Sequence, residues 1–217
     1  MSDTIIFDVD GTLVDSNYQH ALAWYRALRR YRITVPLWQI HRAIGMGGDQ
    51  LVTHVAGRQA ESDHGDALRE AWAEEFEPLL PEIAAFADAV PLLTAVRERG
   101  LTLVLASSGA PRHVQAYLEL IDGQRLADAW TTSEDVESTK PAPDLVQAAM
   151  EKVGAGSAVM IGDSTWDARA AGKLGVPTFA VRTGGFSDTE LRDAGAIAVY
   201  DSLASLQASL DEIIAGS

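Results

Sequence analysis

The sequence predicts an α/β protein with a doubly wound, Rossmann-like parallel sheet and an all-helical domain inserted after the first strand. In the second half of the chain, short apolar runs alternate with helical stretches of about ten residues, the pattern of a parallel sheet covered by helices. Runs such as Leu103-Val104-Leu105 suit strands buried on both faces. Between residues 16 and 86, apolar residues instead recur at helical spacing without a convincing strand. We therefore expect a core domain, residues 1–15 and 87–217, and an inserted helical domain, residues 16–86.

The elements of the core domain can be assigned in order. The first strand contains the apolar run Ile5-Ile6-Phe7, and Gly100 and Gly175 each end a helix further along the chain. After the insertion we expect, in order, a helix over 90–99, a strand over 101–106, a helix over 111–121, a short strand near Trp130, a helix over 143–153, a strand over 158–161, a helix over 165–174, a strand over 178–181, a helix over 188–194, a strand over 197–200 and a helix over 203–214.

Composition excludes several classes of function. The chain has 217 residues, and 17 basic against 31 acidic side chains give a net charge of −14, which argues against nucleic acid as a partner. There is no cysteine, so disulfides, thiolate metal sites and a cysteine nucleophile are excluded. No apolar run approaches the length of a membrane span, and the N-terminus lacks the features of a signal peptide. We expect a cytoplasmic protein without membrane contact; a monomer and a homodimer both stay open.

Two carboxylates close the first strand, in the segment Asp8-Val9-Asp10-Gly11-Thr12. Alternate residues of a strand share a face, so Asp8 and Asp10 start out pointing the same way, and Gly11 permits a sharp turn after them. Such a pair needs a shared proton or a hard cation to offset its repulsion. A strand that simply ends in an Asp-Gly turn is the alternative interpretation.

Three further polar clusters lie at the ends of expected elements, and open parallel sheets bind ligands beyond the carboxyl ends of their strands. They are Ser107-Ser108-Gly109, Lys140-Pro141 and Gly162-Asp163-Ser164-Thr165-Trp166-Asp167. Each has a purely structural alternative: a helix cap at Ser107, an exposed loop with Pro143 starting a helix, and a turn with an N-cap at Gly162 to Ser164. Their joint order along the chain makes it improbable that all three alternatives hold.

With these four clusters in this order, the chain resembles the haloacid dehalogenase superfamily. Within it, the chain is similar to the phosphatases and phosphomutases with a helical cap after the first motif, the phosphoglycolate phosphatase and β-phosphoglucomutase-like group. The resemblance covers nearly the whole length. It implies a magnesium-dependent phosphotransferase that acts through an aspartyl-phosphate on a small phosphorylated metabolite, with residues 16–86 as the cap domain.

The residue types suit that chemistry. Asp8, at the end of the strand, is the better candidate for the nucleophile, because carboxylates accept phosphoryl groups. Asp10 would give a proton to the leaving alkoxide and later take one from the attacking water. Mg²⁺ prefers oxygen ligands, which Asp8, the backbone carbonyl of Asp10 and Asp163 would supply, while Asp167, one helical turn on, would orient a metal-bound water.

The substrate's phosphate needs positive charge beside this acidic group, because each like-charge contact costs on the order of 4 kcal/mol at an effective dielectric constant near 20. Mg²⁺ and Lys140 would supply it. The Ser107 hydroxyl and the backbone N–H groups near Ser108 and Gly109 would complete an anion cradle.

The inserted domain contains the glycine-rich segment Ile44-Gly45-Met46-Gly47-Gly48-Asp49. It lacks the Lys and Ser/Thr of a P-loop and follows no expected strand, so it is not a nucleotide-binding fingerprint. By the resemblance, Arg42, Met46, Gly47 and Gly48 are candidate substrate-binding residues; a simple helix connection is the alternative.

Three other activities compete with a phosphatase. Sugar-phosphate mutases of the family carry a basic clamp near the position of Gly48 and a basic residue near Ala110, which this chain lacks; Arg42 and Arg112 are out of register. A hydrolytic dehalogenase would not need Asp10 or a metal. A signalling receiver domain also uses an Asp acceptor and Mg²⁺, but it places its acidic pair before the acceptor strand and has no comparable helical insertion.

Overall fold

A computed structural model describes residues 2–216. The chain divides into two compact units. The first contains the chain up to Asp15 and from Ala85 onward, and the second contains Ser16–Ala84. Each unit is described by itself below.

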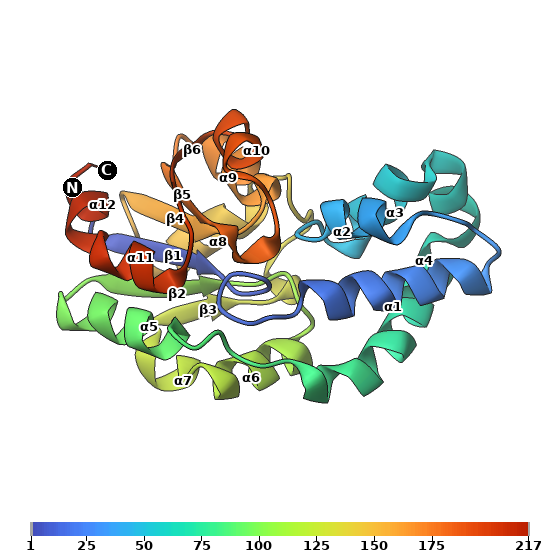
Figure 1. Ribbon diagram of the computed structural model, residues 1–217, viewed down its shortest axis with the longest axis horizontal. Helices are drawn as coiled ribbons and strands as arrows, with labels where there is room; N and C mark the ends of the chain where they lie inside the picture. Colours follow the sequence, from blue (N-terminus) through green and yellow to red (C-terminus); the bar gives the residue numbers. More distant parts are fainter. Residues whose placement is uncertain (1, 217) are drawn as a thin grey trace. The chain divides into compact units, whose positions relative to one another are not determined.

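The first unit is built on a parallel sheet in the order β3-β2-β1-β4-β5-β6, which confirms the doubly wound, Rossmann-like fold (Figure 1). The N-terminal strand β1 lies inside the sheet, and the strand order reverses on either side of it. The strands are β1 (Thr4–Asp8), β2 (Thr102–Ala106), β3 (Ala129–Thr131), β4 (Ala158–Gly162), β5 (Thr178–Val181) and β6 (Ala196–Tyr200).

The helices of this unit largely follow the expected order. They are α5 (Ala89–Glu98), α6 (Pro111–Leu120), α7 (Gly123–Leu126), α8 (Asp144–Val153), α9 (Thr165–Gly172), α10 (Asp188–Asp193), α11 (Leu203–Ala208) and α12 (Leu210–Ala215). The single helix expected over 203–214 is wrong, because the chain leaves helical geometry at Ser209, where ψ is 9°. The one-turn helix α7 was not expected.

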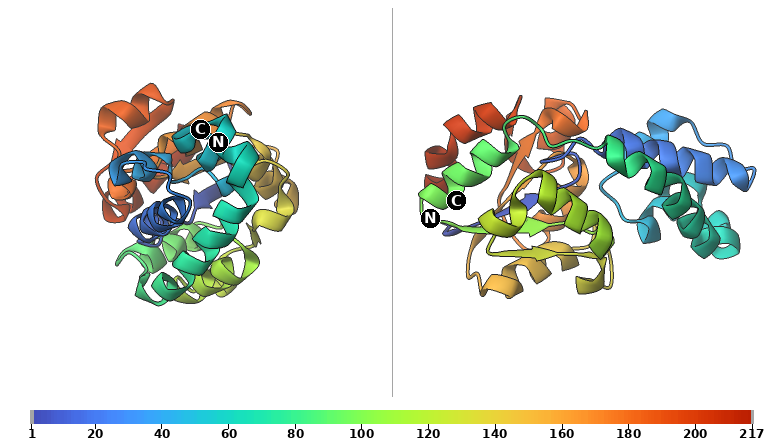
Figure 2. Two further views of the ribbon diagram at one scale, coloured as in Figure 1. Left: turned by 90° about the vertical axis from the view of Figure 1, so that its right-hand side faces the viewer. Right: turned by 90° about the horizontal axis from the view of Figure 1, so that it is seen from below.

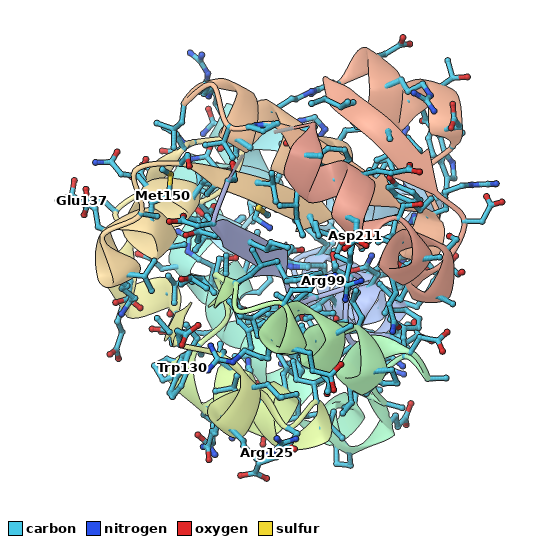
Figure 3. The ribbon with its side chains drawn as sticks, turned by 90° about the vertical axis from the view of Figure 1, so that its left-hand side faces the viewer. Arg99, Arg125, Trp130, Glu137, Met150 and Asp211 are labelled. Carbon is cyan, nitrogen blue, oxygen red and sulfur yellow. The ribbon has the colours of Figure 1, made fainter. Side chains whose placement is uncertain are left out.

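Helices cover both faces of the sheet, as the apolar strands predict. Ile6 of β1 and its neighbour Val104 of β2 point to the same face of the sheet, where they pack with α8 and α9 in one buried cluster. Leu105 points to the opposite face, where its side chain lies close to Gly123, the first residue of α7. On the surface, Arg99, which directly follows α5, pairs with Asp211 of α12 at 2.7 Å (Figure 3).

The second unit is entirely helical. Its helices are α1 (Asn17–Arg30), α2 (Leu37–Ala43), α3 (Gly48–Ala56) and α4 (Arg58–Phe76), followed by the 3₁₀ helix η1 (Glu77–Glu82). Helices α1 and α4 pack side by side (Figure 2). Trp24 of α1, Leu51 of α3 and Leu68 of α4 share one apolar cluster, so this unit has a core of its own.

Of the helices in residues 2–216, none combines the length and the apolar character needed to cross a membrane.

Candidate active site

The sheet register brings the sequence-predicted clusters to one edge. Asp8 ends β1 beside Ala106 of β2, so Ser107 follows at the next position. On the other side, Phe7 pairs with Ile161 of β4, so Gly162 is level with Asp8 and Asp163 lies one residue beyond. Because these strands are parallel and adjacent, their carboxyl ends present these side chains together.

Lys140 reaches this edge from the loop before α8. Its ammonium donates to Asp8 Oδ1 and to Asp167 Oδ1, each at 2.6 Å, and its side chain is only 2% exposed. An exposed loop at this position is therefore excluded. Buried ammonium and carboxylate groups are stable only when paired, so the Lys140 bridge fixes how the Asp8 carboxylate is turned.

Burial and charge shift the protonation of both partners. Burial, together with the nearby Asp167 and Asp163 carboxylates, holds the pKa of Asp8 well above its usual range, although Lys140 opposes this effect. Burial alone would lower the pKa of Lys140, but the adjacent Asp167 and Asp8 carboxylates raise it above its usual range. The Lys140 ammonium therefore stays charged. The raised pKa of Asp8 means that this carboxyl binds a proton more readily than an exposed aspartate does.

The carboxylates fit a hard cation. One oxygen each of Asp8, Asp163 and Asp167 lies within 4.8 Å of the others, and all three residues are buried. Among the described residues, Lys140 brings one positive charge to two of these three carboxylates, Asp8 and Asp167. An all-oxygen, anionic donor set is what Mg²⁺ prefers. Thr12 holds Asp163 in this group by donating from Oγ1 to Asp163 Oδ1 at 2.8 Å.

Asp167 also lies in the first turn of α9, where it caps the helix together with Ser164. Its Oδ2 accepts hydrogen bonds from the Ser164 backbone N–H at 3.0 Å and from the Ser164 hydroxyl at 2.6 Å. Turn and capping chemistry is thus present at this motif, as the structural alternative supposed. It coexists with the buried contact to Lys140, because Asp167 uses one oxygen for each.

Asp10 lies beside Ser107, as the strand order requires. The Ser107 hydroxyl donates to Asp10 Oδ2 at 3.3 Å and accepts from the Gly109 backbone N–H at 3.0 Å. Ser107 does not cap α6: that helix has Ala110 at its N-cap and no capping side chain there. Ser108 and Gly109 are partly exposed at the same strand end.

A tyrosine that sequence reasoning missed also contacts Asp10. Tyr117 lies on the buried face of α6 and is 1% exposed. Its hydroxyl hydrogen-bonds the Asp10 carboxyl; burial, followed by the negative charge of Asp10, raises the pKa of Tyr117. The signal in the sequence was a tyrosine on the apolar side of the helix after the serine cluster, since a buried tyrosine hydroxyl needs a partner.

The candidate residues in the inserted segment belong to the second unit. Arg42 lies in the last turn of α2, Met46 packs against the apolar cluster, and Gly47 and Gly48 begin α3. A Cβ atom at Gly48 would lie 3.0 Å from the Trp24 ring and 3.1 Å from Arg69 Cγ. A side chain at Gly48 would therefore require the Trp24 ring or the Arg69 side chain to shift by a few tenths of an ångström.

Known proteins resemble this chain over most of its length. Residues 5–181 match the haloacid dehalogenase-like hydrolase family. A phosphoglycolate phosphatase of Rhodospirillum rubrum is 30% identical over 224 residues, covering 95% of this chain and 90% of that protein. The pyrophosphatase PpaX of Oceanobacillus iheyensis is 28% identical over 182 residues, covering 82% of each. The crystal structure of a hydrolase from Pseudomonas syringae, 34% identical, superimposes with a TM-score of 0.90 and covers 97% of this chain and 98% of that one. The chain therefore belongs to the haloacid dehalogenase-like hydrolases.

Proposed function

We propose that this chain is a Mg²⁺-dependent phosphomonoester hydrolase that acts on a small phosphorylated metabolite through an aspartyl-phosphate on Asp8. The observation that carries the proposal is the buried group in which Lys140 joins Asp8 to Asp167 beside Asp163. Family membership and the similarity to proteins named as phosphatases support the coarser conclusion that the chain hydrolyses phosphate esters.

In the first half of the reaction, an Asp8 carboxylate oxygen forms a bond to phosphorus as the bond from phosphorus to the ester oxygen breaks. Asp10, held beside Ser107, gives its proton to the departing alkoxide. Lys140 holds Asp8 Oδ1, so the attacking group is oriented before the substrate arrives.

In the second half, water attacks the phosphorus of the aspartyl-phosphate and gives a proton to Asp10. The bond from phosphorus to the Asp8 oxygen breaks, and inorganic phosphate leaves. Mg²⁺ held by Asp8, Asp163 and the backbone carbonyl of Asp10, with Asp167 nearby, would neutralise negative charge on the phosphoryl group. Ser107 and the backbone N–H groups at Ser108 and Gly109 would bind its remaining oxygens.

A phosphate-release screen over a broad panel of metabolite esters, with Mg²⁺ and with a chelator, tests the proposal. We expect release only with Mg²⁺. Asp8→Asn should lower turnover to below about one hundredth of the parent, because an amide cannot accept the phosphoryl group. Asp193→Asn removes an exposed carboxylate of α10 and serves as the matched control, with unchanged turnover.

Other outcomes would identify the competing activities. Conversion between sugar-phosphate isomers without phosphate release would indicate a mutase. A phosphorylated protein that persists for minutes would indicate a receiver-like acceptor. Phosphate release by Asp8→Asn near the parental rate would exclude Asp8 as the nucleophile.

A further inference from the structure

The Asp163 carboxylate lies between two separate parts of the first unit. On one side, Thr12, just after β1, donates to Asp163 Oδ1 at 2.8 Å, and both residues are buried. On the other side lies Gly184, in the 3₁₀ turn Arg182–Gly184 that follows β5. A Cβ atom on Gly184 would lie 1.8 Å from Asp163 Oδ2 and 2.9 Å from the Asp163 backbone oxygen.

These distances leave no room for any side chain at residue 184. The second contact is with a backbone atom, so rotating the Asp163 side chain alone would not relieve a clash there. The turn cannot easily withdraw either, because Val181, three residues earlier, is paired with Tyr200 in the sheet. Gly172 of α9 offers the opposite case: its added Cβ would meet nothing within 4 Å.

We propose that Gly184 is a positioning residue for the metal site: its bare backbone and the Thr12 hydroxyl hold the Asp163 carboxylate between them, facing Asp8 and Asp167. This inference rests on the metal site of the proposed function and adds the turn after β5 to it. Neither Thr12 nor Gly184 would itself be a ligand of the ion. Each acts by fixing a ligand, and loss of such support typically weakens metal binding about 10- to 100-fold.

Isothermal titration calorimetry with Mg²⁺ alone, on the full chain without substrate, tests the proposal. Gly184→Ala should weaken Mg²⁺ binding by about 10- to 100-fold, because its methyl group displaces Asp163. Gly172→Ala, the matched control, should bind within about twofold of the parent, since its methyl group points into open space. Circular dichroism of each variant in chelator reports whether it is folded.

A second pair of variants covers the case in which Gly184→Ala does not fold. Thr12→Val keeps the shape of residue 12 but removes the donor to Asp163 Oδ1, and should also weaken Mg²⁺ binding. Thr12→Ser keeps a hydroxyl and should restore most of the affinity. A folded Gly184→Ala protein with parental affinity overturns the role of Gly184, and equal affinities of the two Thr12 variants overturn that of Thr12.

The outcomes separate this inference from the proposed function. A parent chain that binds no Mg²⁺ overturns both the metal site and the inference. A parent chain that binds Mg²⁺ but hydrolyses no ester overturns the phosphatase activity, whereas the binding data still decide the roles of Gly184 and Thr12.

Discussion

At the scale of single residues, Asp8 couples metal binding to pH. Burial and the neighbouring Asp167 and Asp163 hold its pKa well above the usual value of 3.8. A proton on this carboxyl competes with a metal ion for the same oxygens. Because the pKa of Asp8 is raised, protonation of Asp8 interferes with metal binding up to a higher pH than protonation of an exposed aspartate would.

We therefore expect Mg²⁺ binding to weaken as the pH falls. Once the pH is below the pKa of Asp8 in the folded chain, the affinity should drop by about tenfold per pH unit for one displaced proton. Calorimetric titrations in two buffers of different ionisation enthalpy measure the number of protons released. An affinity that stays constant as the pH is lowered toward the usual pKa of an aspartate would contradict a raised pKa at this ligand.

Tyr117 is a second residue whose contribution to the reaction can be measured separately from its contribution to packing. Its hydroxyl holds the carboxyl of Asp10, which the proposed reaction uses to protonate the leaving group. Tyr117→Phe keeps the ring and removes the hydrogen bond. We expect kcat to fall about tenfold for alkyl phosphates, which need a proton, and much less for aryl phosphates, with KM nearly constant.

Val114→Ala is the control for Tyr117→Phe. It opens a small cavity on the same buried face of α6 but breaks no hydrogen bond to Asp10. Equal losses on alkyl and aryl esters in Tyr117→Phe, or the same alkyl preference in Val114→Ala, would show that Tyr117 acts only through packing.

At the scale of elements, the C-terminal end of α8 is formed by one residue with a left-handed backbone conformation. Gly154 caps this helix with φ of 65°, and Ala155 N–H bonds back to Met150 O at 3.0 Å. Gly154→Ala should cost about 1 kcal/mol of unfolding free energy, because a side chain disfavours that conformation. The added Cβ would meet no atom within 4 Å, so crowding makes no contribution.

Urea unfolding of Gly154→Ala beside Gly172→Ala measures this cost. Gly172 is also a helical glycine with open space around it, but its φ is not positive, so alanine there should be neutral or stabilise by up to about 1 kcal/mol. Equal unfolding free energies for the two variants would contradict a backbone origin.

The elements that the sequence predicts well are those with a strong local signal. Apolar runs such as Ile5-Ile6-Phe7 locate buried strands, and Gly100 marks a helix end correctly. The break at Ser209 and the four-residue helix α7 carry no comparable signal, because short helices depend on the surface they pack against.

The candidate site also contains some features that the sequence predicts and others that it does not. Motif order along parallel strands is enough to place Asp8, Ser107 and Asp163 at one edge, since the register follows from the topology. The double contact of Lys140, the hydroxyl of Tyr117 on Asp10 and the close approach of Gly184 depend on distances between segments remote in sequence. Periodicity and motif spacing contain no such distances.

At the scale of the whole molecule, the two units are connected in a way that suggests separable folding. The chain leaves the first unit after Asp15 and returns to it at Ala85. Those ends are close together, because Val14 pairs with Ala85 and Phe86 N–H bonds to Leu13 O at 3.0 Å. Each unit has its own apolar cluster. Insertions are tolerated at such sites when the flanking ends lie side by side.

We therefore expect the first unit to fold when residues 16–84 are replaced by a flexible linker of about four Gly and Ser residues. Asp8, Asp163 and Asp167 all belong to this unit, so the shortened chain should keep cooperative unfolding and bind Mg²⁺ within about tenfold of the parent. Urea unfolding followed by circular dichroism, with calorimetric Mg²⁺ titration, measures both properties.

Asp8→Asn in the same shortened chain is the control, and it should abolish the Mg²⁺ signal. A shortened chain that unfolds without cooperativity would show that the sheet needs the helical unit for stability, whereas a cooperative chain without Mg²⁺ binding would show that the helical unit organises the carboxylates.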